Sequence, residues 1–237
     1  MSYSIFAYYY FPFDKWYFLL VLPSFLLALY AQFKVKSSFS KYSQIASSRG
    51  ITGAQLAHEI LQAAGLLNVG VERVRGNLTD HYSPREEVLR LSDPVYNSSS
   101  IAALGVAAHE SGHALQYGDA YFPIKLRSAI YPLASIGSAA GPYMAVFGLV
   151  MQLDLLFNIG ILFYAVAVLF YLFTLPVEFN ASRRALEVLE TGNYLNSEEL
   201  KGARSVLRAA AMTYIASATT AFVSLLRLIL IRNEQRR

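Results

Sequence analysis

Two histidines with a glutamate between them are the residues of this sequence best suited to chemistry. His109 and His113 stand four residues apart, and Glu110 directly follows the first. On an α-helix this spacing places both imidazoles on one face, where they can share a metal ion, with the Glu110 carboxylate beside them. Two neutral imidazoles suit zinc, which in catalytic sites keeps one position for water. A chain of this composition contains the HExxH pattern by chance only roughly 0.003 times, so two histidines that merely pack on a helix are the weaker explanation.

A zinc site of this kind needs a third protein ligand, and two carboxylates are candidates. Asp119 has the spacing of a third ligand in metzincin-type sites, but Gln116 stands where those sites have a glycine. Glu178 heads a helical face of small residues, namely Ala181, Ser182 and Ala185. We favour Glu178, because a carboxylate on a closely packed face must meet a partner. The alternative is an interfacial glutamate that caps a helix N-terminus. His58 lacks a second histidine at helical spacing and is interpreted as a surface or core residue.

The elements that must position these residues include long apolar stretches. Of the 237 residues, 55% are hydrophobic and 15% are charged, against roughly 25% charged in soluble domains. Four stretches carry no Asp, Glu, Lys or Arg, and each is about long enough to cross a bilayer: residues 16–33, 128–153, 155–177 and 209–226. The composition excludes a freely soluble enzyme, a disordered chain and a nucleic-acid binder with a basic surface. The absence of cysteine excludes disulfides and thiolate metal sites.

The sequence predicts a membrane helix near each end of the chain. We interpret residues 1–33 as an uncleaved signal anchor whose aromatic stretch Tyr8–Phe13 forms an interfacial belt. Residues 209–237 are expected to be a membrane or membrane-associated helix with a basic tail, in which Arg227 snorkels to the surface. Fifteen of the 20 lysines and arginines lie in residues 34–127 and 178–208. The positive-inside rule therefore predicts that both segments are cytoplasmic.

Between these ends the sequence predicts a small α+β unit, a membrane hairpin and a helical segment. In residues 34–127 we expect a helix, a strand pair and a second helix, at residues 52–66, 69–78, 87–92 and 101–116. A turn is expected at Tyr82–Arg85, and Ser98–Ser100 should cap the second helix. Residues 128–177 should form a two-helix hairpin that turns around Asp154. A helix that begins at Val177 should lead into residues 178–208 and stop at Gly192. Another helix should follow from about Ser197.

The motif and two further segments resemble a known family. The HESGH motif, Pro176–Ala185 and Leu78–Pro84 are similar to those of the YugP-type neutral zinc metallopeptidases of bacterial membranes, and the likeness runs from about residue 40 onward. That family is similar to the HtpX-type and CAAX prenyl protease-type gluzincins. The resemblance implies that His109, His113 and Glu178 hold one Zn²⁺ per chain.

The same resemblance assigns a role to Glu110 and shows two departures from the pattern. It implies that Glu110 is the catalytic base. Ser182 stands where the wider gluzincins tend to have aspartate, and Ser83 stands where the closer family usually has aspartate. Asp80 and His81 either form a structured turn or contribute a polar wall of the active site.

We therefore expect a mainly α membrane protein with about four transmembrane helices and a small cytoplasmic α+β zincin-like domain. Its predicted function is that of a membrane-embedded zinc endopeptidase of the bacterial plasma membrane. Peptides or proteins, membrane proteins included, would be substrates, and nucleic acid would not be a partner. No substrate-binding residue is indicated, although the strand at Glu87–Ser92 could pair with an extended peptide. The alternatives are a membrane scaffold that retains a metal site, which three ligands argue against, and a transporter, which the charge-free spans argue against.

Overall fold

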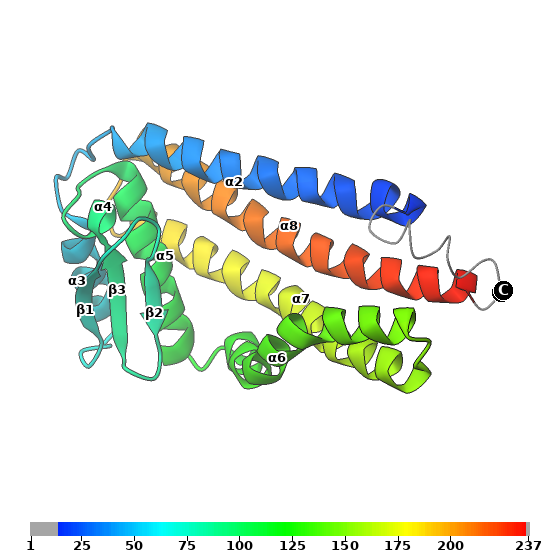
Figure 1. Cartoon of the computed structure of the whole chain (residues 1–237). Helices are drawn as coiled ribbons and strands as arrows, with labels where there is room; N and C mark the ends of the chain where they lie inside the picture. The colour runs from blue at the N-terminus through cyan, green and yellow to red at the C-terminus, as the bar shows by residue number, and fades with distance from the viewer. Residues whose placement is uncertain (1–13, 236–237) are drawn as a thin grey trace. The chain divides into compact units, whose positions relative to one another are not determined.

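The structure is a computed structural model, and it describes residues 14–235 of the chain. The predicted aromatic belt at Tyr8–Phe13 and the last two residues of the basic tail, Arg236 and Arg237, lie outside the described residues. The described part is mainly helical and contains one small sheet (Figure 1). This agrees with the predicted fold class of four long apolar helices and a small α+β part.

Two compact units make up the chain, and each combines distant parts of the sequence. The first unit comprises residues 1–31, 126–175 and 213–237, and the second comprises residues 32–125 and 176–212. The histidine motif and Glu178 both belong to the second unit. The five segments expected from the sequence concern membrane exposure, which these units do not test, and they stay predictions.

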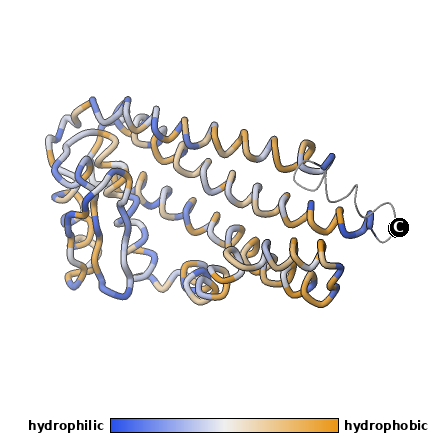
Figure 2. Tube along the Cα trace, viewed as in Figure 1, coloured by the Kyte–Doolittle hydropathy of each residue, from blue (hydrophilic) through white to orange (hydrophobic). Residues whose placement is uncertain are grey.

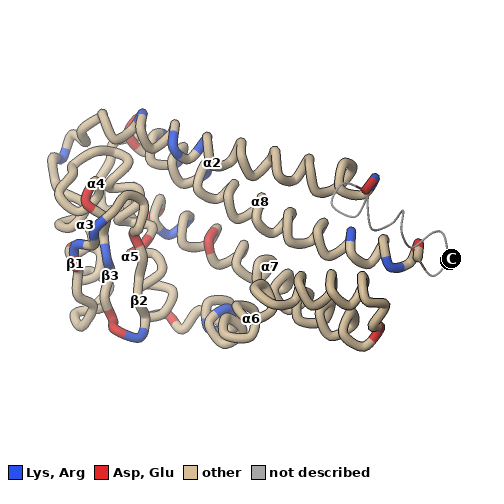
Figure 3. Tube along the Cα trace, in the orientation of Figure 1, with Lys and Arg blue, Asp and Glu red and all other residues tan. Residues whose placement is uncertain are grey.

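Within residues 14–235, four long helices have the length and the apolar composition needed to cross a membrane. The π-helical turn η2 (Tyr17–Val21) leads into α2 (Leu22–Ser43), and the other three are α6 (Phe122–Val150), α7 (Asp154–Thr191) and α8 (Ser197–Gln235). In chain order, an 18-residue stretch of each has a mean hydropathy of 1.8, 1.5, 2.3 and 1.8. Figure 2 shows apolar residues along these helices, and Figure 3 shows their long uncharged stretches. The four predicted membrane helices are thus confirmed by length and composition.

Helix α7 continues through the point at which the sequence predicted a new helix. The prediction that a helix begins at Val177 is wrong, since α7 runs unbroken from Asp154 to Thr191 with Pro176 inside it. A proline within an apolar helix removes only one backbone donor and does not by itself end the helix. The predicted stop is confirmed, because α7 ends before Gly192 and Asn193 takes a positive φ of 52°. Glu178 therefore lies within a long helix and does not cap a helix N-terminus.

Ion pairs join charged residues at the helix ends of the first unit. Arg227 donates hydrogen bonds to Asp14 Oδ2 from Nε (2.9 Å) and Nη2 (2.6 Å). Lys15 lies 2.6 Å from Glu234, and Arg232 pairs with Asp154. Arg227, which was expected to snorkel, thus has a carboxylate partner within its own unit. Pairing reduces the cost of placing a charged side chain among apolar helices.

The small sheet of the second unit has three strands, where the sequence predicted two. Strand β3 (Val88–Ser92) lies between β1 (Gly70–Val74), with which it is parallel, and β2 (His81–Ser83), with which it is antiparallel. The predicted turn at Tyr82–Arg85 is wrong in its first half, because Tyr82 and Ser83 belong to β2. The Tyr82 ring packs 5.7 Å from the Tyr117 ring, and this tertiary contact favours an extended strand over the local turn preference.

The side chain of Asp80 continues the pairing of β3 beyond the end of β2. Its carboxylate oxygens accept hydrogen bonds from the Ser92 backbone N–H (2.7 Å) and the Ser92 hydroxyl (2.9 Å). Strand β3 therefore has partners along both sides, and β1 and β2 are the outer strands of the sheet. Of the two interpretations of Asp80, these contacts support the structured turn.

Helix α5 (Ile101–Gly118) carries the histidine motif through the centre of the second unit. Its N-cap is Ser100, whose hydroxyl accepts a hydrogen bond from the Ala103 N–H, as predicted for this serine cluster. Helix α3 (Gly53–Ala63) begins with the predicted Thr52 cap, and a short helix α4 (Asp93–Tyr96) precedes α5. Thirteen of the 18 residues of α5 are buried, so the helix is surrounded by the core.

Gly112 allows the backbone of α7 to approach α5 at van der Waals distance. A Cβ atom at Gly112 would lie 2.8 Å from the Ala181 carbonyl oxygen, which is closer than real Cβ contacts. At Gly105, about two turns earlier on α5, a Cβ would lie 3.5 Å from the Ala203 Cβ, an ordinary contact. The two glycines therefore differ in what an added methyl group would meet.

We predict that Gly112→Ala destabilises the protein, by about 1–3 kcal/mol, because the methyl group must push two helix backbones apart. Gly105→Ala is the matched control and should be neutral or stabilising, since alanine favours helix and has room there. Thermal unfolding of both variants in detergent, followed by circular dichroism, measures the difference. Equal midpoints for the two variants would contradict the close approach of α5 and α7.

Candidate metal centre

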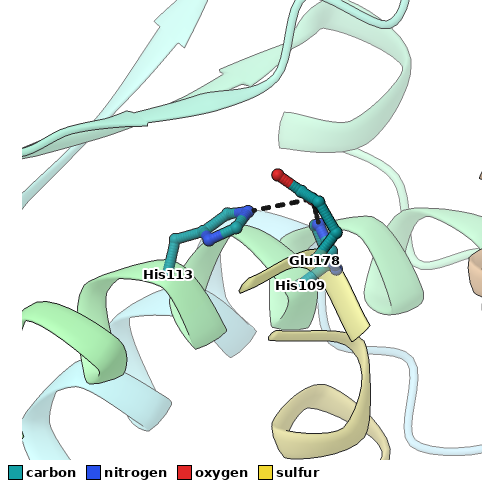
Figure 4. A group of neighbouring side chains, drawn as sticks. All are labelled: His109, His113 and Glu178. Carbon is teal, nitrogen blue, oxygen red and sulfur yellow. Dashed lines mark ion pairs between the residues drawn. The ribbon is translucent and has the colours of Figure 1, made fainter. Parts of the chain in front are cut away.

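Three buried side chains of the second unit converge on one point. The carboxylate Oε2 of Glu178 lies 3.3 Å from His109 Nε2 and 3.5 Å from His113 Nε2 (Figure 4). One ligand atom from each of the three residues lies within 4.8 Å of the others. Glu178 is 2% exposed, and each histidine is 9% exposed. This is a group of two imidazoles and one carboxylate that could hold a metal ion.

Two helices position the three side chains. His109 and His113 are one turn apart on α5, and their rings lie edge to face with centroids 4.8 Å apart. Glu178 comes from α7, which approaches α5 closely at Gly112. The prediction that Glu178 joins the histidines is thus matched by the geometry. The reason given for it also holds, because Ala181 and Ala185 on the same face are completely buried.

Each imidazole contacts a polar side chain through its second ring nitrogen. His109 Nδ1 lies 3.2 Å from the Ser182 hydroxyl, and His113 Nδ1 lies 3.0 Å from Gln116 Oε1. Histidines that bind metals characteristically have such a partner, which orients the ring. Ser182 thus contacts one of the two histidines of this group.

Gln116 is the residue of this site that sequence reasoning missed. It was considered only as the replacement of an expected glycine, whereas its buried side chain contacts His113 from three residues further along α5. A polar residue at the i+3 position from a metal-binding histidine lies on the same helix face, and that spacing was the available signal.

The charges around His113 favour a cation at this point. Burial lowers the pKa of His113, but the hydrogen bond with Glu178 and the negative charges of Glu110 and Glu178 outweigh burial, so the pKa is raised above its ordinary value. Glu110 is half-buried and follows His109 directly on α5. The carboxylates that stabilise a proton on His113 would also stabilise a divalent cation.

The other candidate residues lie outside this group. Asp119, the alternative third ligand, follows α5 as its C-cap and pairs with Arg184. His58 is exposed on α3, as expected for a surface residue. His81 is exposed on β2, and its Nδ1 lies 2.8 Å from the Thr79 carbonyl oxygen. Among the described residues, Glu178 therefore lies with the two histidines, and Asp119 does not.

Comparison with known families agrees with this chemistry. A family model described as "Putative neutral zinc metallopeptidase" matches residues 17–233, which is most of the chain. The chain therefore belongs to this family of neutral zinc metallopeptidases, and the resemblance inferred from the motif is confirmed.

A curated relative extends the comparison to a named bacterial protein. The chain is 46% identical over 205 residues to the "Putative membrane protease YugP" of Bacillus subtilis (strain 168). The match covers 86% of this chain and 91% of that protein. No protein of known structure gives a significant match. The similarity to a protein named as a membrane protease and the four apolar helices together indicate a membrane protein.

We predict that zinc binding depends on Glu178 and is independent of Asp119. Glu178→Gln keeps the size of the side chain but offers a weaker ligand, so most of the zinc should be lost on washing with a chelator. Asp119→Ala removes an exposed carboxylate that pairs with Arg184, and it should leave the zinc content unchanged. Mass spectrometry of the metal in detergent-purified protein measures both. Zinc retained in the first variant and lost in the second would reverse the assignment.

Proposed function

We propose that the protein is a zinc-dependent endopeptidase in which His109, His113 and Glu178 hold one zinc ion per chain. The observation that supports this most strongly is the convergence of two Nε2 atoms and one carboxylate oxygen in a buried position, in a member of a zinc metallopeptidase family. This donor set suits zinc, and three protein ligands leave a coordination position for water or substrate. A structural zinc site would normally use four protein ligands, which argues against a scaffold.

The residues around the metal would divide the work of peptide hydrolysis. When bound, zinc supplies Lewis acidity, which polarises a peptide carbonyl and acidifies water. Glu110, next to a ligand on α5 and half-buried, would accept a proton from the attacking water on its carboxylate and deliver it to the nitrogen of the leaving amine. His109 and His113 would remain neutral ligands, held by Ser182 and Gln116. In this scheme the HExxH helix supplies two ligands and the base of a gluzincin-type enzyme.

An extended peptide substrate would pair with an outer strand of the sheet. The expectation that the strand at Glu87–Ser92 offers this edge is wrong, because β3 has a partner on each side. Strand β2 is an outer strand and packs against α5 through Tyr82 and Tyr117. We therefore assign substrate pairing to β2, whose free side offers main-chain donors and acceptors to an extended peptide. Peptides and proteins, membrane proteins included, are the proposed substrates.

We also propose that the site faces the cytoplasm in the bacterial plasma membrane. The support is the charge distribution, in which residues 34–127 and 178–208 carry fifteen of the 20 lysines and arginines. The relative from Bacillus subtilis is named as a membrane protease, which is consistent with a bacterial membrane. The two segments carry all four residues of the proposed site, so one side of the membrane must hold both.

Glu110→Gln tests the proposed chemistry. The amide keeps the size of the side chain but accepts no proton, so proteolysis should fall by about 10²–10⁴-fold or more. Zinc content should stay the same, because the three ligands are untouched. Glu187→Gln, an exposed substitution on α7, is the matched control and should retain activity.

Cleavage of casein by the purified protein in detergent, with and without a chelator, measures the activity. Near-complete activity of Glu110→Gln, or activity that a chelator does not remove, would contradict a zinc peptidase with this base. Absence of activity in the wild-type protein with zinc bound would favour the scaffold.

Cysteine labelling tests the orientation, because the natural chain contains no cysteine. Arg73→Cys and Lys201→Cys replace exposed residues of the two basic segments, and Leu153→Cys lies in the turn between α6 and α7. An impermeant thiol reagent added to intact cells should label position 153 and spare positions 73 and 201. Labelling of 73 and 201 alone would invert the orientation, and labelling of only one of these two would exclude a shared site.

A further inference from the structure

Gln116 makes hydrogen bonds at both ends of its amide while completely buried. Its Oε1 lies 3.0 Å from His113 Nδ1, and its Nε2 donates to the Val177 carbonyl oxygen (2.8 Å) and to Asn180 Oδ1 (2.9 Å). Its exposed fraction is 0%. The side chain therefore connects a proposed ligand on α5 with the backbone of the residue that directly precedes Glu178 on α7.

The partners of Gln116 fix the orientation of its amide. The Val177 carbonyl oxygen can only accept a hydrogen bond, so the amide nitrogen must face it. Asn180 Oδ1 also accepts from Arg184 Nε (2.9 Å), and a guanidinium can only donate, so this oxygen is an acceptor for Gln116 as well. Both acceptors require Gln116 Nε2 to point toward α7. Gln116 Oε1 must then point toward His113.

This orientation determines which nitrogen of His113 is available to a metal. Because Nδ1 faces an oxygen acceptor, it carries the proton and donates a hydrogen bond to Gln116 Oε1. In the neutral ring the lone pair is then on Nε2, the atom that lies 3.5 Å from Glu178 Oε2. The chain of donors and acceptors from Arg184 through Asn180 and Gln116 thus favours the ligating form of His113.

His109 has no comparable constraint. Its Nδ1 contacts the Ser182 hydroxyl at 3.2 Å, and a hydroxyl can either donate or accept by rotating. Ser182 therefore accommodates both neutral forms of His109. Of the two partners, only Gln116 discriminates between the two ring nitrogens.

We propose that Gln116 is a positioning residue for His113. It holds the neutral ring in the tautomer that has its proton on Nδ1 and its lone pair on Nε2, and it keeps Nε2 directed toward Glu178. The proposal rests on the zinc site proposed above. Gln116 would touch neither the substrate nor the metal, so its effect should appear first in zinc affinity. Loss of such a partner of a metal-binding histidine typically weakens metal binding about 10–100-fold.

Gln116→Met tests the proposal, because it keeps the length of the side chain and removes both hydrogen-bonding groups. Its zinc affinity, measured by competition with a chromophoric chelator, should fall about 10–100-fold. Its casein cleavage should recover as zinc is raised, because the defect lies in binding of the metal. Gln62→Met, an exposed substitution on α3, is the control and should bind zinc as the wild type does.

Gln116→Glu separates the bond to His113 from the bonds to α7. A carboxylate still accepts a hydrogen bond from His113 Nδ1 but loses both hydrogen bonds to α7. Because the bond to His113 is retained, its zinc affinity should lie between that of the wild type and that of Gln116→Met. The visible spectrum of the Co²⁺-substituted proteins reports coordination geometry in the folded fraction alone. It should be altered in Gln116→Met and close to the wild type in Gln116→Glu.

Two results would overturn the proposal. One is wild-type zinc affinity in Gln116→Met; the other is equal impairment of Gln116→Met and Gln116→Glu, since the bond to His113 would then not be what Gln116 contributes. Should Gln116→Met fail to fold, nitrogen NMR of the neutral His113 ring in the zinc-free wild type still tests the proposal, because a proton on Nδ1 supports it and a proton on Nε2 opposes it. A wild-type protein that binds no zinc would instead refute the proposed zinc site.

Discussion

Helices α5 and α7 approach so closely at Gly112 that a methyl group there would lie 2.8 Å from the Ala181 carbonyl oxygen. This backbone contact is possible only because both helix faces carry small residues, Ala108 and Ala181 among them. It brings the Glu178 carboxylate to the two imidazoles of α5 and removes all three from water. A buried carboxylate is costly unless cations or hydrogen-bond donors surround it, so close packing and metal-binding chemistry are two consequences of the same contact.

The polar side chains next to this contact have hydrogen-bonding partners, although they are buried among apolar residues. Gln116 and Ser182 each bind an imidazole, and Gln116 also binds the backbone of α7. Buried polar networks are stable only when nearly every member has a partner, and they then specify one arrangement of the helices. The small residues therefore set the distance between α5 and α7, while the hydrogen bonds set their register.

The local sequence was sufficient to predict some parts of this structure and insufficient for others. Helical spacing alone places His109 and His113 on one face, and the small residues after Glu178 indicated a closely packed face. Strand β2 was missed because its local sequence favours a turn, whereas in the structure it pairs with β3 and Tyr82 packs against Tyr117, which is distant in sequence. For Gln116, the spacing from His113 could have indicated the contact with that ring, whereas its two partners on α7 could not be predicted from the local sequence.

The continuity of α7 bears on where the proposed chemistry takes place. Residues 155–177 carry no charge, and Glu178 follows them on the same unbroken helix. No loop therefore separates the third proposed ligand from the apolar run that precedes it. If that run crosses the membrane, the proposed ligand lies within about one helical turn of the membrane boundary.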